Sequence, residues 1–462
     1  MALIIKQKPL YNILPVGQPV IYTVFDSTVV SSKFKVKYIA EVHISSTTPP
    51  NTSTGTAAVG TFKTTPNNAG VGIFDLSKVV ESYVNSDNNS AEDSLYKGNQ
   101  LTNIETDYRP LQTTDKFSMT NNSVRWLAIV FKIEGAATAT GVPSIQDTEN
   151  SQVYLLFNGY LKRTDVLDKS TTNADFGFDT TDFVLSSNAS KFLTNAPNTQ
   201  YAEVGDYGTL SFLRTDGTLD NVLFTFTDQS GSTTTETFKP TQANGGSAYN
   251  TEAERNLLHL GAFPANLRNW SSTFQTLITN DNLDFYTVVL RNAANSAISE
   301  TITIYRQCPD LKGYEAIRLC WLNQYGVWDY YTFTKRSNRS ITTQGTQYNQ
   351  IEGTWNESYY QVNGYKGGKK SFRVNAMERL TINTDYVNEA EGVWFEELSN
   401  SPEVYIVNGF SDIVDTNTTL STYVEPVRLT TSSYTRKTIA NDKLMQYTFE
   451  LEKSKILRTQ AV

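Results

Sequence analysis

Hydrophobic and polar residues alternate along residues 33–45, and this is the clearest local pattern in the chain. One face carries the apolar side chains from Phe34 to Ile44, whereas the other carries Lys35, Glu41 and His43. A period of two with one polar face predicts a half-buried antiparallel strand whose His43 side faces solvent. Further strands are predicted at residues 20–25, 124–133 and 153–161, and the last two are apolar on both faces, which favours central positions.

A short helix is expected after Asp75, which suits the N-cap position. Its apolar stripe is formed by Leu76, Val79, Val80 and Tyr83, which recur with helical spacing.

A second block of strands follows residues 165–200, which are rich in Ser, Thr and Asn and are expected to form a linker. Strands are predicted at residues 209–213, 222–227, 285–290 and 301–305. The segment before Gly261 could form a helical turn.

The third block begins with an aromatic hairpin near residue 317. Asn323 and Gly326 fit the first and fourth positions of a type I turn between strands 317–322 and 328–334. A helix is expected from Asn388, with Glu391 completing a capping box and Pro402 ending the helix. Strands at residues 403–407 and 445–451 complete the block.

The predicted fold is mainly β, with two to three antiparallel β-sandwich-like domains and a few short helices. We expect an N-terminal β-sandwich domain at residues 1–165, a middle β domain with its linker at 166–307, and a C-terminal β domain at 308–462. Hydrophobic residues make up 39% of the 462 residues and charged residues only 19%, which is unlike a disordered chain. The exterior is therefore expected to be polar but largely uncharged.

Charge and cysteine content exclude several classes of protein. The net charge is −8, and short basic runs such as Lys369–Lys370 are too isolated for phosphate binding, so no nucleic-acid partner is expected. Cys308 and Cys320 cannot build a disulfide scaffold; free thiols are favoured, although a pair across neighbouring strands stays open. No apolar run approaches the ~20 residues of a membrane span, and the N-terminus lacks signal-peptide features, so a soluble protein without membrane insertion is expected.

Catalytic candidates are few. His43 and His259 are the only histidines, and His259 lies among leucines in "LLHLG", which favours a packed or hydrogen-bonded side chain over a base. No zinc, nucleotide or nucleophile motif is present, and "NGYKGGKK" is interpreted as a flexible tip rather than a phosphate loop. We therefore expect no enzyme activity and no catalytic, cofactor-binding or metal site.

A glycosidase is the weighed alternative, because paired carboxylates can hydrolyse glycosides. Glu396 and Glu397 are adjacent on a helix and point to different sides, whereas Asp329 lies between two aromatic residues, as in a sugar-binding cleft. Asp329 equally suits an acid that caps a turn or faces solvent.

The aromatic residues of the hairpin can serve as core, as a carbohydrate platform or as a protein interface. Both faces of its second strand carry rings, and a lone domain is expected to bury only one face of a sheet. Aromatic residues are enriched in interface cores, so core plus interface is favoured over sugar binding.

Three groups of segments carry a resemblance to a known family. They are "QKPLYNILPVGQPVIYTV" with "FKVKYIAEVHI" and "GVGIFDLSKVVESYV", then "LCWLNQYGVWDYYTF", and finally "WFEELSNSPEVYIV" with "MQYTFELEKS". In these segments the sequence resembles structural proteins of tailed-bacteriophage virions, of the type found in marine, gut and Bacteroidetes phages. The middle domain matches loosely, through "NLLHLG" and "AISETITIYR".

The resemblance implies a non-enzymatic virion component of the tail or neck region, such as a ring, hub or fibre-adaptor protein assembled in the host cytoplasm. Its partners would be other copies of itself in a ring and other tail, neck or fibre proteins. A receptor- or glycan-binding tail-tip or fibre protein, which would bind a host surface glycan, and a capsid decoration protein are the alternatives.

Subunit contacts are expected at the hairpin, at the helix near residue 394 and at the N-terminal segment 1–9, which is apolar and expected to be an unanchored arm. The interface candidates are Trp321, Tyr325, Trp328, Tyr330, Tyr331, Phe333, Trp394, Phe395, Leu3, Ile4 and Ile5.

Overall fold

The structure is a computed structural model, and it confirms a mainly β fold with 47% strand and 11% helix. It describes residues 2–46, 49–50, 57–86, 117–119, 122–162, 167–172, 174–214, 219–239, 256–307, 314–407, 424–431, 433–435, 445–454 and 457–461. Cys308 lies outside these residues.

The chain forms two compact units. The first comprises Met1–Cys308 with Leu322–Tyr330, and the second comprises Pro309–Trp321 with Tyr331–Val462. The tip of the aromatic hairpin thus belongs to the first unit, while the rest of the hairpin belongs to the second. The expected division into three domains stays a prediction.

Two sheets form the N-terminal part of the first unit. The smaller has the order β1-β3-β6, and the larger has the order β2-β10-β8-β4-β5, with β9 paired to β8. Their strands are β1 (Ile4–Gln7), β2 (Ile13–Pro15), β3 (Ile21–Phe25), β4 (Phe34–Ser45), β5 (Gly60–Thr64), β6 (Val71–Asp75), β8 (Val124–Ala136), β9 (Ser144–Asn150) and β10 (Tyr154–Phe157). As predicted, β8 and β10 are interior and largely buried.

Two sequence predictions about this part are wrong. His43 is only 6% exposed, because residues 38–43 of β4 are buried or half-buried on both faces of the strand. The N-terminal segment is anchored, since β1 pairs with β3 and the Leu3 backbone N–H donates to Asp147.

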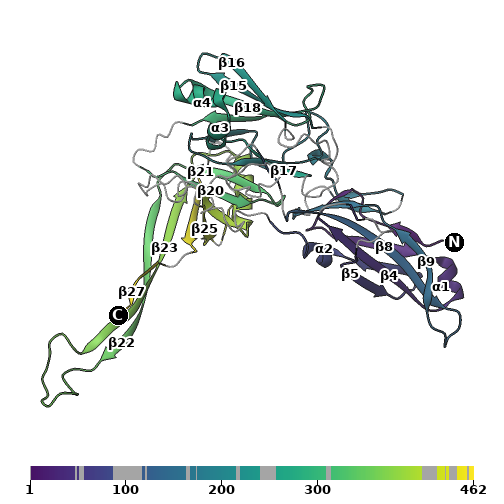
Figure 1. Cartoon of the computed structure of the whole chain (residues 1–462), viewed down its shortest axis with the longest axis horizontal. Coiled ribbons are helices and arrows are strands. Elements are labelled where there is room, and N and C mark those ends of the chain that lie inside the picture. The colour runs from purple at the N-terminus through teal and green to yellow at the C-terminus, as the bar shows by residue number, and fades with distance from the viewer. Residues whose placement is uncertain are drawn as a thin grey trace. The chain divides into compact units, whose positions relative to one another are not determined.

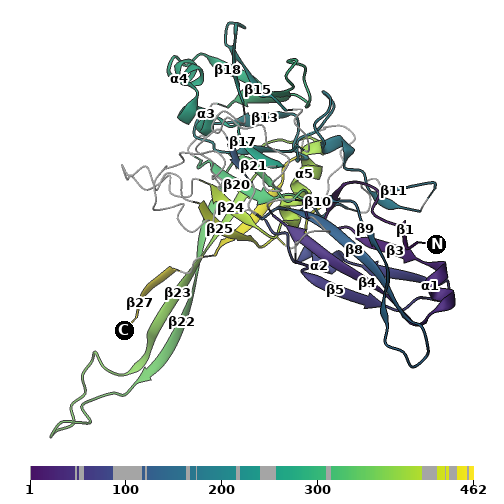
Figure 2. The same cartoon turned by 45° about the vertical axis from the view of Figure 1, so that its right-hand side comes forward.

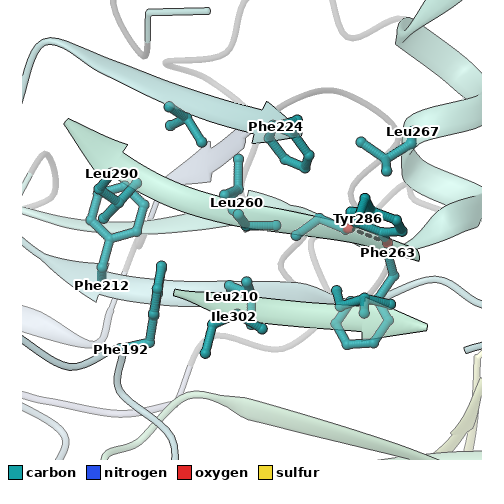
Figure 3. Packing of buried hydrophobic residues seen from close by; sticks show 14 of the residues in the cluster. Phe192, Leu210, Phe212, Phe224, Leu260, Phe263, Leu267, Tyr286, Leu290 and Ile302 are labelled. Atoms are coloured by element: carbon teal, nitrogen blue, oxygen red, sulfur yellow. Dashed lines mark hydrogen bonds between the residues drawn. The ribbon is translucent and has the colours of Figure 1, made fainter. Parts of the chain in front are cut away.

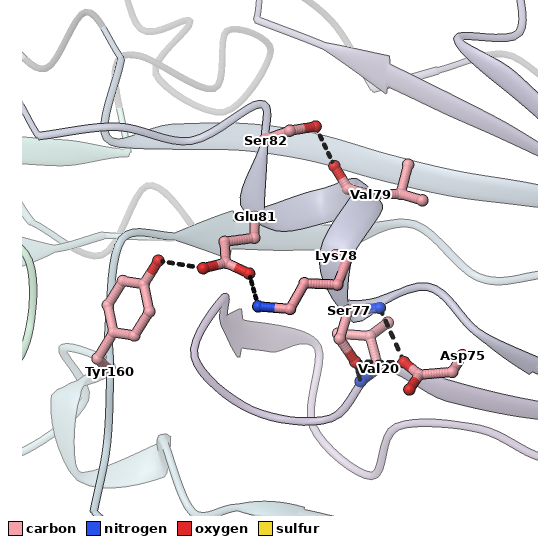
Figure 4. A network of polar contacts seen from close by, with 8 residues as sticks. All are labelled: Val20, Asp75, Ser77, Lys78, Val79, Glu81, Ser82 and Tyr160. Atoms are coloured by element: carbon pink, nitrogen blue, oxygen red, sulfur yellow. Dashed lines mark hydrogen bonds and ion pairs between the residues drawn. The ribbon is translucent and has the colours of Figure 1, made fainter.

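The short helices of this part are α1 (Ser27–Ser32) and α2 (Ser77–Glu81). Asp75 was the expected N-cap of α2, but it ends strand β6, and Leu76 takes the cap position. The Asp75 carboxylate instead accepts hydrogen bonds from the backbone and hydroxyl of Ser77 (Figure 4). Of the predicted apolar stripe, Leu76 and Val80 are buried and Val79 is half-buried, whereas Tyr83 is exposed because the helix ends at Glu81.

The middle part of the first unit contains two further sheets and two helices. The sheets have the orders β13-β19-β18-β15-β16 and β14-β17-β7. Their elements are β7 (Phe117–Met119), β13 (Thr199–Ala202), β14 (Thr209–Leu213), β15 (Asn221–Asp228), β16 (Thr233–Phe238), β17 (Leu257–Gly261), α3 (Pro264–Trp270), α4 (Ser272–Thr279), β18 (Leu283–Arg291) and β19 (Ile302–Arg306). All four strands predicted here are confirmed.

Buried side chains of these elements form one core, which Figure 3 shows from close by. Tyr286 is fully buried in this core, and its hydroxyl donates to the Ala262 carbonyl at 2.8 Å. The expected helical turn before Gly261 is wrong: residues 257–261 form β17, and the helix starts afterwards at Pro264. Proline is favoured in the first turn of a helix because no partner exists there for a backbone N–H.

Residues 167–193 contain β11 (Leu167–Lys169), β12 (Phe176–Phe178) and a 3-10 turn, η3 (Thr181–Phe183). Phe178, Phe183, Phe192 and Leu193 are buried. This segment is therefore packed into the first unit and is more than a connecting linker.

The second unit is built on one sheet with the order β21-β20-β24-β25-β26-β23-β22, and β27 pairs with β23. Its elements are β20 (Ile317–Leu322), β21 (Trp328–Phe333), β22 (Asn338–Gln350), β23 (Gly368–Asn383), α5 (Glu389–Asn400), β24 (Val404–Val407), β25 (Val424–Leu429), β26 (Thr448–Lys453) and β27 (Leu457–Ala461). Within this sheet, β22 and β23 continue beyond β24 and β25 as a long ribbon (Figures 1 and 2).

Candidate functional site

The aromatic hairpin is part of the chain's own core. Asn323 and Gly326 form the predicted turn, with a 3.0 Å bond from the Gly326 N–H to the Asn323 carbonyl. Seven of the interface candidates from the hairpin and helix are at most 6% exposed, namely Trp321, Tyr325, Trp328, Tyr330, Phe333, Trp394 and Phe395. The premise that a lone chain would leave one ring-bearing face of the hairpin uncovered is therefore wrong, because these rings are buried within the chain. A subunit-contact role for these residues stays a prediction.

Helix α5 covers the part of the hairpin in the second unit. Asn388 and Glu391 form the predicted capping box at its start. Phe395 packs edge-on against the half-buried Tyr331, with ring centroids 4.9 Å apart, and Trp394 lies 4.9 Å from Trp321. The rings predicted as subunit contacts thus pair with each other.

The hairpin tip packs inside the first unit. Tyr325 lies 4.7 Å from the Phe183 ring, and the Tyr160 N–H donates to the Gln324 carbonyl. Gly326 has a φ of +73°, and a Cβ at this position would lie 2.0 Å from the Asn158 carbonyl oxygen. Only glycine fits this close approach.

The N-terminal candidates divide by burial. Leu3 is buried at 1%, Ile5 is half-buried and Ile4 is 46% exposed. Their role as subunit contacts stays a prediction.

The catalytic candidates occupy packed or hydrogen-bonded positions. His259 is 1% exposed, and its Nδ1 lies 2.8 Å from the Ser211 hydroxyl, as a packed histidine would. Asp329 is 5% exposed and accepts a bond from the Thr194 hydroxyl at 2.7 Å. Burial also raises the pKa of the Cys320 thiol, which keeps this free cysteine protonated.

Figure 4 shows a polar network on the first unit. Glu81 binds Lys78 at 2.6 Å and accepts a longer bond from the Tyr160 hydroxyl at 3.3 Å. The Lys78 contact lowers the pKa of Glu81, whereas partial burial and the Glu81 charge raise the pKa of Tyr160. These shifts keep each group in its ordinary charge state at neutral pH, so the network ties residue 160 to helix α2 without forming an acid–base pair.

The residues most available to a partner lie on the ribbon formed by β22, β23 and the connecting residues 351–367, which we call the tip loop. In β22, eleven of thirteen residues are exposed and the other two are half-buried. Residues 368–372 of β23 are also exposed, apart from the half-buried Lys370. Since successive side chains of a strand point to opposite faces, both faces of this distal part of the ribbon are open.

Hydrogen bonds give the tip loop a defined shape. Thr354 is 5% exposed; its hydroxyl donates to the Tyr359 carbonyl and accepts from the Gln361 N–H, each at 2.8 Å. The Trp355 indole N–H donates to the Glu352 carbonyl. Gly353 has a φ of +77° and lies under the Tyr360 ring, where a Cβ would come within 2.4 Å.

This shape displays apolar side chains. The exposed large apolar residues of the tip loop are Ile351 at 70%, Trp355 at 71%, Tyr359 at 79%, Tyr360 at 57%, Val362 at 64% and Tyr365 at 72%. The tip loop itself contains Glu352, Glu357 and Lys366, and three further basic residues, Lys369, Lys370 and Arg373, follow it in β23. The tip loop is thus an aromatic surface with basic residues beside it on β23.

Sequence reasoning located this tip at "NGYKGGKK" but overlooked its aromatic display. The signal was present, since residues 355–365 contain Trp355, Tyr359, Tyr360 and Tyr365 between glycines, without the alternation of a buried strand. The hairpin near residue 321 gives the stronger sequence signal for an aromatic surface, because aromatic residues are more closely spaced there.

The described residues offer weaker candidates for a ligand pocket, a metal site or a membrane span. A cavity of about 350 Å³ lies beside the end of α5, but its Arg428 is already paired with Glu452. No group of three or more His, Cys, Asp or Glu residues in the described ranges is placed to hold a metal ion. No helix that the structure describes is long and apolar enough to cross a membrane.

Comparisons with known proteins add little to this picture. No protein-family model matches the chain, and no curated protein matches it. A solved structure of Escherichia coli alpha-2-macroglobulin in its native conformation aligns with a TM-score of 0.19 and 7% identity, over 82% of this chain. The chain spans 22% of that protein's length, and a likeness this low supports no conclusion about family or function.

Proposed function

We propose that the chain is a non-enzymatic structural component of a tailed-phage virion, such as a tail or neck ring, hub or fibre-adaptor protein. It acts through contacts with other copies and other virion proteins. The resemblance in the N-terminal, hairpin and C-terminal segments supports the family, and the exposed aromatic tip loop carries the argument for assembly.

An uncovered ribbon with exposed rings is energetically unfavourable in water. A two-stranded ribbon without a covered face is marginally stable in water. Large apolar side chains gathered on one exposed element mark interaction sites. Tryptophan and tyrosine are enriched among the hot spots of protein interfaces, so a partner that covers Trp355 and Tyr359 would stabilise both the ribbon and the assembly.

The test compares the double variant Trp355→Ser/Tyr359→Ser with the control Tyr386→Ser. Tyr386 is 64% exposed in the same unit but lies outside the ribbon. Both variants should fold as the parent chain does, because the changed side chains are exposed. The double variant should enter particles about tenfold less efficiently, since loss of two hot-spot rings weakens an interface by at least that factor. Equal incorporation of all three chains would refute a contact role for the tip loop.

A glycan-binding tail-tip protein is the second candidate, because exposed rings beside cations also suit sugar stacking. Trp328 is 2% exposed and cannot present its ring to a sugar, so Trp355 is the residue to change. Binding to host polysaccharide that Trp355→Ala abolishes would favour this candidate. Particle stoichiometry separates a decoration protein, present in hundreds of copies, from a ring protein present in few.

A further inference from the structure

The outer edge of the ribbon is an open hydrogen-bonding surface. Strand β22 is the last strand of its sheet, and β23 is its sole strand partner in the residues that the structure describes. Along an antiparallel strand, alternate residues point both backbone groups toward one neighbour and the intervening residues point them away. Half of the thirteen residues Asn338–Gln350 therefore direct backbone groups outward.

This edge lacks the usual protection against pairing. Edge strands are commonly blocked by lysines, prolines, bulges or short length. Arg339 is the one charged residue in β22, and the strand contains no proline. The register shift between Thr346 and Gln347 skips a residue of β23, so β22 itself runs without a bulge.

We propose that β22 pairs antiparallel with β22 of a second copy of this chain, forming a two-fold symmetric sheet across the two ribbons. The length of β22 favours a second copy of β22 as the partner strand. The next longest edge strand that the structure describes is β9, with seven residues. Among these edge strands, another β22 is the one long enough to pair with all thirteen residues.

Symmetry and full overlap together fix the register. Identical strands in a two-fold antiparallel pair must align residues whose numbers are both even or both odd, so one residue faces its own copy across the axis. Full overlap of residues 338–350 places that axis at Gln344. About a dozen backbone hydrogen bonds would then join the copies.

The resulting side-chain pairs are compatible. Thr342 lies opposite Thr346 of the second copy, and Ile341 lies opposite Gln347 of the second copy. Arg339 lies opposite Asn349 of the second copy, so no like charges face each other. Paired threonines on neighbouring strands are a favourable combination.

This pairing deepens the proposed function and rests on it for the assembly that the dimer would serve. It is nevertheless a property of the purified chain, whereas the tip-loop test uses particles. A failure of one test is therefore distinguishable from a failure of the other.

The first experiment uses disulfide trapping under mild oxidation. Thr342→Cys and Thr346→Cys chains, one carrying a size tag, are mixed; a second mixture combines Ile341→Cys with Gln347→Cys. Opposed Cα atoms lie about 4.5–5.5 Å apart, within disulfide range, so at least one mixture should give the mixed dimer. Each variant alone should not crosslink, because residues 341, 342, 346 and 347 each lie on the order of 14 Å or more from the same residue of the second copy. The parent chain under the same conditions controls for Cys308 and Cys320.

The second experiment measures dimer dissociation by sedimentation equilibrium. Thr342→Lys/Thr346→Lys places two like-charged pairs across the axis, whereas Thr342→Lys/Thr346→Glu places two opposite-charged pairs there. All four changes are on exposed positions of one strand. The Lys/Lys chain should dissociate about tenfold more readily than the Lys/Glu chain.

Mixed crosslinks together with weaker association of the Lys/Lys chain would support the pairing. A chain that stays monomeric at all concentrations and forms no mixed crosslink would overturn it. A crosslink from Thr342→Cys alone, or equal association of both charge variants, would overturn the proposed register.

Discussion

Replacing Phe395 with alanine should remove the centre of the core between helix α5 and the hairpin. Phe395 is fully buried, and its ring lies within 6.3 Å of six others, those of Trp321, Tyr331, Phe333, Trp394, Tyr447 and Phe449. Truncation would leave a cavity that these large rings cannot readily collapse into, since each is held by the others.

The expected magnitude follows from this packing. A buried Phe→Ala change costs about 3–5 kcal/mol of unfolding free energy, and aromatic pairs add about 0.5–1.5 kcal/mol beyond burial. We therefore expect a loss near 5 kcal/mol, which is a large fraction of the 5–15 kcal/mol that typically stabilises a domain. The matched control is Phe372→Ala on the ribbon, which is 51% exposed and should cost less than about 0.5 kcal/mol.

Urea denaturation followed by tryptophan fluorescence measures both variants, because Trp321 and Trp394 lie beside Phe395. The Phe395→Ala midpoint should fall markedly, while the Phe372→Ala midpoint should stay near that of the parent chain. A Phe395→Ala chain within about 1 kcal/mol of the parent would show that these rings do not form a core. Their availability for an interface would then have to be reconsidered.

Three further predictions concern the caps and the turn. Asn388→Ala removes the side-chain cap of α5 and should cost about 0.5–2 kcal/mol in urea denaturation, whereas Asn388→Ser should restore most of it. Gly326→Ala forces a Cβ against the Asn158 carbonyl at a left-handed φ and should lower the unfolding free energy by about 2–5 kcal/mol; an unchanged denaturation midpoint would contradict that close approach. Burial raises the pKa of Glu391, although its bond from the Asn388 N–H partly opposes this. The folded chain therefore binds the proton of the Glu391 carboxyl more tightly than the unfolded chain does. This difference stabilises the folded chain fully below the ordinary Glu pKa of about 4.3, and the stabilisation is lost as the pH rises through the pKa of Glu391 in the folded chain. Glu391→Gln should remove this fall in stability, measured as denaturation midpoints between pH 4 and pH 7, and an identical pH profile for both chains would refute it.

Local patterns predicted the elements well where alternation and turn chemistry agree. The strands near residues 209 and 328, the turn from Asn323 to Gly326 and the capping box at Asn388 follow from side chains that act on their own neighbours. These interactions involve only a few adjacent residues, so packing elsewhere in the folded chain does not change them.

These local patterns do not predict which residues are buried by contacts with distant parts of the chain. His43 has polar neighbours in sequence, yet both faces of β4 are covered at this point in the folded chain. The sequence before Gly261 is leucine-rich and compatible with either element, and pairing of β17 with β14 decides for a strand.

Long-range packing also explains why the exposed aromatic surface lies on the tip loop and not on the hairpin predicted from the sequence. Rings on both faces of the hairpin indicated a partner, but α5 and the first unit each cover their own part of it. The tip loop, by contrast, has no strand pattern, and the exposure of its rings depends on hydrogen bonds that Thr354 donates to Tyr359 and accepts from Gln361.

The central claim is that the tip loop is covered by another polypeptide in the assembled particle. Hydroxyl-radical footprinting of Trp355 and Tyr359, in the free chain and in purified particles, tests it directly. We predict strong labelling of both rings in the free chain, where they are 71% and 79% exposed, and clear protection in the particle. Equal labelling in the two states would contradict the account.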